Sequence, residues 1–189
     1  MQRAVGAAAV APCDLRDPAA VTAFIDSLAR ELGGLDALVN NAGQVVRKSI
    51  FDLGIDEWQA MVETNLSGMF CAIKAALPHL RKHGGHIINV SSISGYMPLP
   101  GGGGYAATKY GVTRFSESLF GELREYGIKV GVIFPGSVDW ESHRHDANAD
   151  HSWKIDPEKV GDAVEAMLST SDKTCIRALG IRPISRGPR

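Results

Sequence analysis

The chain has 189 residues, 44% of them hydrophobic, and a formal net charge of −1 at pH 7. This length allows a buried core, and we expect one domain, 1–189. The balanced charge gives no basic excess for nucleic-acid binding, and no apolar run reaches membrane-spanning length. Three cysteines lie far apart without metal-ligand spacing. We therefore expect free thiols, a cytoplasmic protein and no metal site.

Hydrophobic periodicity predicts alternating strands and helices. A helix is expected at Pro18–Leu32, capped by Asp17 and ended by Gly33-Gly34. Further helices are expected at Asp56–Lys82, at Tyr105–Tyr126 and after Asp156-Pro157. Strands are expected at Val5–Cys13, Leu35–Asn40, His86–Ser91, Lys129–Phe134 and Thr174–Ile181. The alternation favours an α/β fold with a mostly parallel, doubly wound sheet.

The stretch Tyr105-Ala-Ala-Thr-Lys109 combines an acid and a cation at helical spacing. A step of four residues puts both side chains on one helix face, where the ammonium can stabilise a phenolate and lower a pKa that is normally about 10. Ser92 follows the apolar run His86 to Val90, as expected at the carboxyl end of a buried strand. By chance alone, roughly one such chain in six contains a Tyr-x-x-x-Lys pattern. The alternative reading of this pair is an exposed tyrosine and lysine on the solvated face of a helix.

Other motifs occur in a fixed order around this pair. Leu35 to Val39 precedes Asn40-Asn41-Ala42-Gly43, Asn65 lies in Glu-Thr-Asn-Leu-Ser-Gly, and Pro135-Gly136 follows the last of the central strands. Together with Ser92, Tyr105 and Lys109, these motifs resemble the short-chain dehydrogenase/reductase family from about Pro12 to Pro183. The resemblance implies a Rossmann-like fold.

The resemblance also implies catalytic roles. In this family the tyrosine is the general acid or base, the lysine binds the nicotinamide ribose and lowers the tyrosine pKa, and the serine holds the substrate oxygen. These residues correspond to Tyr105, Lys109 and Ser92. Asn65 corresponds to the asparagine that helps to hold a water in the proton relay. The spacing from Gly95 and Tyr105 favours Ser92 over its neighbours Ser91 and Ser94.

The implied cofactor is NAD or NADP, without a preference between them. Asp14-Leu15 resembles the pair that contacts adenine, and Asn41, Ala42 and Gly43 resemble the turn beside the adenosine ribose. Asn40-Asn41-Ala42-Gly43 alone is also compatible with an ordinary turn. The remaining implied contacts come from Tyr105, Lys109, Pro135, Gly136 and Val138. Trp140 stands where a threonine is common in the family.

The beginning of the family pattern has no counterpart in this sequence. The family starts with a strand, a Thr-Gly-x-x-x-Gly-x-Gly turn and a helix, which hold the pyrophosphate. Here the sequence begins at the approach to the third family strand, so the chain is truncated relative to the pattern. We interpret Gly101–Gly104 as a flexible loop beside the active site, not as a pyrophosphate turn.

The missing strands predict open edges on the sheet. We expect Leu35–Asn40 to stand as an unprotected edge, to pair with the N-terminal strand, or to be covered by another chain. The helices at Asp56–Lys82 and Tyr105–Tyr126 match those that pack between subunits in the family, which favours a homodimer or homotetramer.

The polar segment Trp140–Trp153 contains several groups that could bind a metal or an anion. Their irregular spacing favours solvent exposure over metal binding. These groups are His143, Arg144, His145 and His151.

Two functions remain open at this stage. The first is an NAD(P)-dependent oxidoreductase acting on a small carbonyl or secondary alcohol, encoded by a longer gene in which Met1 is an internal start. The second is a catalytically silent, truncated subunit that acts in oligomer assembly.

Overall fold

The computed structural model describes residues 10–139 and 150–185, which contain one parallel sheet. Its strands are β1 (Ala37–Asn40), β2 (Gly85–Val90), β3 (Ile128–Pro135) and β4 (Ala178–Ile181), in the order β1-β2-β3-β4. All three pairings are parallel. The α/β class predicted from the alternating pattern is confirmed.

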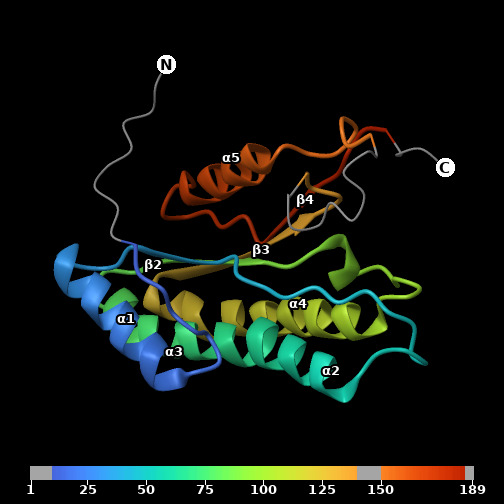
Figure 1. Cartoon of the computed structure of the whole chain (residues 1–189). Helices are drawn as coiled ribbons and strands as arrows, with labels where there is room; N and C mark the ends of the chain where they lie inside the picture. Colours follow the sequence, from blue (N-terminus) through green and yellow to red (C-terminus); the bar gives the residue numbers. More distant parts are fainter. Residues whose placement is uncertain (1–9, 140–149, 186–189) are drawn as a thin grey trace.

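Helices cover the two faces of the sheet unequally. Figure 1 shows α1 (Pro18–Glu31), α2 (Ile55–Val62), α3 (Met69–Leu80) and α4 (Gly103–Leu123) on one side, and α5 (Pro157–Leu168) on the other. The core follows the strand alternation, because successive side chains point to opposite faces. Ile87 packs with the α1, α3 and α4 layer, whereas Ile88 packs against α5.

The predicted helix at Asp56–Lys82 is one continuous helical region with a π-helical turn inside it. The turn covers Glu63–Gly68, between α2 and α3. A π turn inserts one residue into the helical hydrogen-bond pattern and commonly marks a functional site. It contains Asn65, which is 3% exposed.

Two predicted strands differ from the observed ones. Residues 174–177 are not strand, so β4 is shorter than the expected Thr174–Ile181. Residues 10–13 of the expected strand Val5–Cys13 are also not strand, and the rest lies outside the described residues. Cys13 and Leu15 instead pack against the helical layer, because their apolar side chains find a buried surface there.

Strand β1 is an edge of the sheet. Within residues 10–139 and 150–185, it pairs with β2 alone. Of the three expectations for this edge, pairing with the N-terminal strand is not seen at residues 10–13, and cover by another chain stays a prediction. Val39, which points away from α1, is 39% exposed. In the same part of the chain, no helix has both the length and the apolarity to cross a membrane.

Candidate active site

The four predicted catalytic residues come from three elements that meet at the carboxyl end of β2. Ser92 caps the short 3₁₀ turn Ile93–Gly95 that follows β2, and its hydroxyl accepts a hydrogen bond from the Ser94 amide at 3.1 Å. Tyr105 and Lys109 lie one turn apart near the start of α4. Asn65 reaches the same region from the π turn.

Lys109 is buried and connects α4 to the end of β2. Its ammonium donates a hydrogen bond to the Val90 carbonyl at 2.8 Å and lies 5.8 Å from the centre of the Tyr105 ring. The side chain is only 5% exposed. Burial penalises the charged form and lowers the pKa of Lys109 to about 8.

The Tyr105 phenol combines burial with a hydroxyl partner. Burial raises the pKa of Tyr105, while a hydrogen bond with Ser92 and the positive charge of Arg47 act in the opposite direction. The predicted lowering of this pKa is therefore not observed in the protein alone. The physical reason is that loss of solvent disfavours the phenolate, and the Lys109 ammonium is bonded to a carbonyl instead.

Asn65 fixes the loop after β1 against α4. Its amide nitrogen donates to the Gln44 carbonyl and to the Thr108 hydroxyl, both at 2.9 Å, and its oxygen accepts from the Gln44 amide at 2.7 Å. Thr108 in turn donates to the Tyr105 carbonyl at 2.8 Å. Asn65 thus positions the helix that carries Tyr105, and its predicted role in holding a water stays a prediction.

Several buried polar residues around this site were not predicted from the sequence. Thr108 lies between the tyrosine and the lysine, where its hydroxyl could have been recognised as a back-bonding group three residues after Tyr105. A second chain of hydrogen bonds runs from Asn40 to Asn89 and on to Ser116, each at 2.8 Å. These hydrogen bonds join β1, β2 and α4, and no local sequence motif predicts them.

Ser91 and Ser92 have different environments. The Ser91 side chain is buried and donates to the Lys109 carbonyl at 3.0 Å. Ser92 is only partly buried, and its interaction with Tyr105 lowers the pKa of that phenol. This contrast supports the choice of Ser92 made from spacing.

The Gly101–Gly104 segment is partly helical, whereas a flexible loop was predicted. Gly103 and Gly104 belong to α4, whose first turn includes a bond from the Ala106 amide to the Gly102 carbonyl at 2.9 Å. A Cβ on Gly104 would lie 2.9 Å from atoms of both Leu53 and Met61. Gly104 is therefore a packing position, and the expected flexible loop ends before it.

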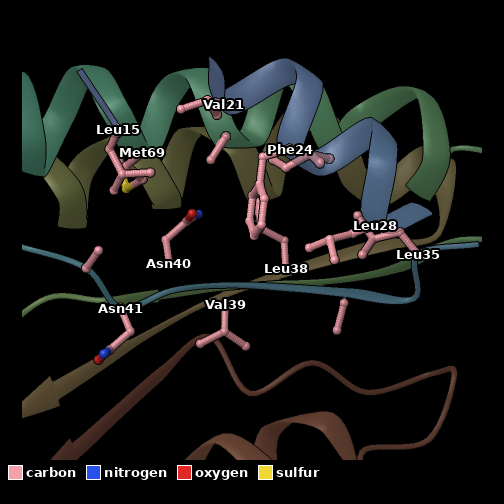
Figure 2. Close-up of a pocket in the computed structure, with 14 residues that line it drawn as sticks. Leu15, Val21, Phe24, Leu28, Leu35, Leu38, Val39, Asn40, Asn41 and Met69 are labelled. Atoms are coloured by element: carbon pink, nitrogen blue, oxygen red, sulfur yellow. The ribbon is translucent and has the colours of Figure 1, made fainter. Parts of the chain in front are cut away.

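The predicted adenosine contacts lie on either side of an apolar cavity. The cavity has a volume of about 240 Å³, and its wall includes Leu15, Asn41 and Ala42. Figure 2 shows Phe24, Leu28 and Leu38 directed into the space between α1 and β1. The cavity is thus lined by predicted cofactor residues at one end and by core residues at the other.

Asp14 and Gly43, two predicted cofactor contacts, have different surroundings. Asp14 is exposed and forms a bidentate ion pair with Arg16, which lowers the pKa of Asp14 to about 2. Gly43 lies close against the catalytic residues, because an added Cβ would lie 3.2 Å from the Asn65 oxygen and 3.6 Å from the Lys109 nitrogen. The absence of a side chain at Gly43 allows this close approach of its backbone.

The segment after β3 runs beside β4. The Gly136 amide donates to the Ile181 carbonyl at 2.7 Å, and Val138 pairs with Ile155 in an isolated bridge. Pro135 is the last residue of β3. Trp140, His143, Arg144 and His145 lie outside the described residues. Residues 10–139 and 150–185 bring together no group of three potential metal ligands.

Comparison with known proteins agrees with this arrangement. The family description "short chain dehydrogenase" matches residues 1–151. This chain belongs to the short-chain dehydrogenase family. An uncharacterized oxidoreductase of Staphylococcus aureus strain MW2 is 34% identical over 176 residues, which are 93% of this chain and 76% of the relative. A homologue from strain MRSA252 matches with the same identity and coverage.

Solved short-chain dehydrogenase structures share the fold. A metagenomic short-chain oxidoreductase in complex with NADP is 29% identical, with a TM-score of 0.81, and the match covers 97% of this chain and 77% of that one. Serine dehydrogenase from Escherichia coli is 31% identical, with a TM-score of 0.76 and coverage of 90% and 74%. This short-chain dehydrogenase is therefore a shortened version of the Rossmann-like fold, with four parallel strands in its described part.

Proposed function

We propose that this short-chain dehydrogenase is an NAD(P)-dependent oxidoreductase that interconverts a carbonyl and a secondary alcohol, with Tyr105 as general acid and base. The observation that carries the proposal is the position of Tyr105 at the carboxyl end of β2, where Ser92 lowers the pKa of its phenol and the buried Lys109 ammonium lies 5.8 Å from the centre of its ring. Two adjacent hydroxyls, one of them with a buried lysine close to its ring, suit proton transfer to an oxygen.

Each residue has a distinct task in this proposal. Ser92 donates a hydrogen bond to the substrate oxygen and orients it. Tyr105 gives its proton to that oxygen in reduction and takes it back in oxidation. Lys109 supplies positive charge beside the phenolate that reduction leaves. The nicotinamide cofactor, when bound, supplies or accepts the hydride.

The residues present fit the two ends of a dinucleotide. Gly43 lies beside Asn65 and the Lys109 ammonium, the group expected to bind the nicotinamide ribose. Leu15, Asn41 and Ala42 border the cavity near the expected adenine position, and Pro135, Gly136 and Val138 line the expected nicotinamide end. The 189 residues contain no glycine-rich pyrophosphate turn, and these residues tested by themselves are expected to bind the cofactor weakly. The NADP in a related structure supports the cofactor class and leaves the choice between NAD and NADP open.

The substrate and the assembly belong to the proposal as well. The substrate is a small carbonyl or alcohol compound. We infer a homodimer or homotetramer, because Phe70 on α3 is 47% exposed and lies in a tilted ring contact with Phe115 of α4, which leaves an aromatic side chain at the surface. The three cysteines are free, which is compatible with a cytoplasmic location.

A silent subunit is the second candidate function. The open edge of β1 and the apolar cavity beside it favour this alternative, since an exposed strand edge suits assembly. In that case the site residues would be retained without turnover.

A turnover assay separates the two candidates. NADH and NADPH are supplied at millimolar concentration with a panel of aldehydes and ketones, and cofactor oxidation is followed by absorbance. We expect turnover by the wild type and a loss of roughly 10²- to 10³-fold in kcat/KM for Ser92→Ala, because a donor to the developing charge is removed. Ser94→Ala is the matched control and is expected to retain turnover. Absence of wild-type turnover with every compound would favour the silent subunit.

A further inference from the structure

Arg47 is a charged side chain beside the candidate active site that the proposed chemistry does not use. It is exposed, and within residues 10–139 and 150–185 no carboxylate pairs with it. We propose that Arg47 binds a carboxylate group of the substrate, which makes the substrate an oxo acid or a hydroxy acid. This inference rests on the proposed oxidoreductase function and names its substrate class.

The loop that carries Arg47 is fixed at its beginning by the active site itself. Gly43 lies next to the Lys109 ammonium, as the 3.6 Å approach of an added Cβ shows. The backbone of Gln44 then forms two hydrogen bonds with the Asn65 side chain. Arg47 follows three residues later, after two partly buried valines.

The loop is fixed again immediately after Arg47. The Lys48 ammonium pairs with the Glu57 carboxylate at 2.6 Å. Glu57 also accepts a hydrogen bond from the Gly54 amide at 3.0 Å and so caps the start of α2. Arg47 is therefore held between two anchored positions, one on the catalytic network and one on α2.

Electrostatics connect Arg47 to the reacting hydroxyl. The positive charge of Arg47 lowers the pKa of the Tyr105 phenol, against the effect of burial. The neighbouring Lys48 has its charge balanced by Glu57. A substrate whose oxygen contacts Ser92 and Tyr105 thus meets the exposed positive charge of Arg47 in the same region, in addition to the buried Lys109 ammonium.

The chemistry of this charge favours a carboxylate. A guanidinium presents a planar fork of donors that matches the two oxygens of a carboxylate and keeps its charge at every physiological pH. One unpaired arginine balances a single negative charge. A phosphomonoester carries almost two charges at neutral pH and would call for further cations.

A specificity assay tests the proposal in the full chain. Oxo acids whose carboxylate is one to four carbons from the carbonyl are compared with their own methyl esters at millimolar NADPH. We expect wild-type kcat/KM to favour at least one acid over its ester, and Arg47→Gln to lower that acid-to-ester ratio roughly ten- to hundred-fold. Arg30→Gln removes the same charge from the exposed last turn of α1 and should leave the ratio within about threefold. An unchanged ratio in Arg47→Gln overturns the proposal.

A second assay decides the proposal without turnover. Phenylglyoxal modifies exposed arginines, and peptide mass spectrometry gives the extent of modification at each one. We expect the same oxo acids, but not their methyl esters, to protect Arg47 at least threefold, while the exposed Arg30 and Arg124 stay unprotected. Equal protection by acid and ester, no protection, or protection by NADP alone overturns the proposal. If the wild type turns over no carbonyl compound, the oxidoreductase function fails while this assay still decides the role of Arg47.

Discussion

The burial of Lys109 gives the active site a measurable electrostatic signature at the residue scale. Because burial lowers its pKa from 10.5 to about 8, the unfolded chain holds this proton and the folded chain releases it between those pH values. The unfolded state therefore binds more protons in that window, and this residue makes the free energy of unfolding rise with pH.

We predict the consequence for Lys109→Met. The unfolding free energy of the wild type, relative to the variant, should rise by about 3 kcal/mol between pH 7 and pH 10.5, at 1.36 kcal/mol for each pKa unit. Urea unfolding of both proteins at several pH values measures this difference in unfolding free energy. Titrating groups that the two proteins share contribute equally to both and cancel in the difference. A difference that is flat across this range would mean that Lys109 titrates normally.

Thr108 is the residue-scale connection between Asn65 and the Tyr105 backbone. Thr108→Val keeps the shape but leaves the Asn65 amide without its buried partner, so we predict a loss of about 1–3 kcal/mol in unfolding free energy. Thr108→Ser retains the hydroxyl and is the matched control, expected to lose less than half as much. A loss in Thr108→Ser as large as that in Thr108→Val would contradict the role assigned to the hydroxyl.

At the scale of elements, the π turn and the N-terminal segment fit together through Gly68. A Cβ on Gly68 would lie 2.8 Å from the Leu15 Cβ and 2.9 Å from the Leu15 carbonyl oxygen. We predict that Gly68→Ala destabilises the protein by about 1–3 kcal/mol because backbone must move. Gly161→Ala in α5 has open space and should stabilise by about 0.5–1 kcal/mol. Thermal unfolding of both variants measures the contrast, and stabilisation by Gly68→Ala would contradict the packing.

Some features of the elements can be predicted from the sequence, and others cannot. Helix α1 was predicted almost to its ends, because Asp17 accepts from two amides of the first turn and glycines follow the last. The π turn was not predicted, since its six residues are too few for the apolar pattern to distinguish a π turn from an α turn. Likewise, Ser92 and Tyr105 lie in recognisable local motifs, whereas the bond from Asn65 to Thr108 spans 43 positions and arises only when the elements pack.

For the whole molecule, the main consequence of the shortened fold concerns the cofactor. Backbone amides at a pyrophosphate contribute several charge-assisted hydrogen bonds of about 1.5–3 kcal/mol each, while micromolar affinity amounts to only about 8 kcal/mol in total. We therefore predict that the 189-residue chain binds NADPH with a Kd above about 100 µM. Fluorescence titration of NADPH measures this affinity, and a low-micromolar Kd would contradict the expected weakness.

The account as a whole depends on the Tyr105 hydroxyl as the group that moves the proton. The most direct measurement is kcat for carbonyl reduction at millimolar NADPH by Tyr105→Phe and by Tyr110→Phe, which removes a second phenol from the same helix. We predict a loss of at least roughly 10²-fold for Tyr105→Phe and little change for Tyr110→Phe. Turnover by Tyr105→Phe at the wild-type rate would contradict the proposed active site.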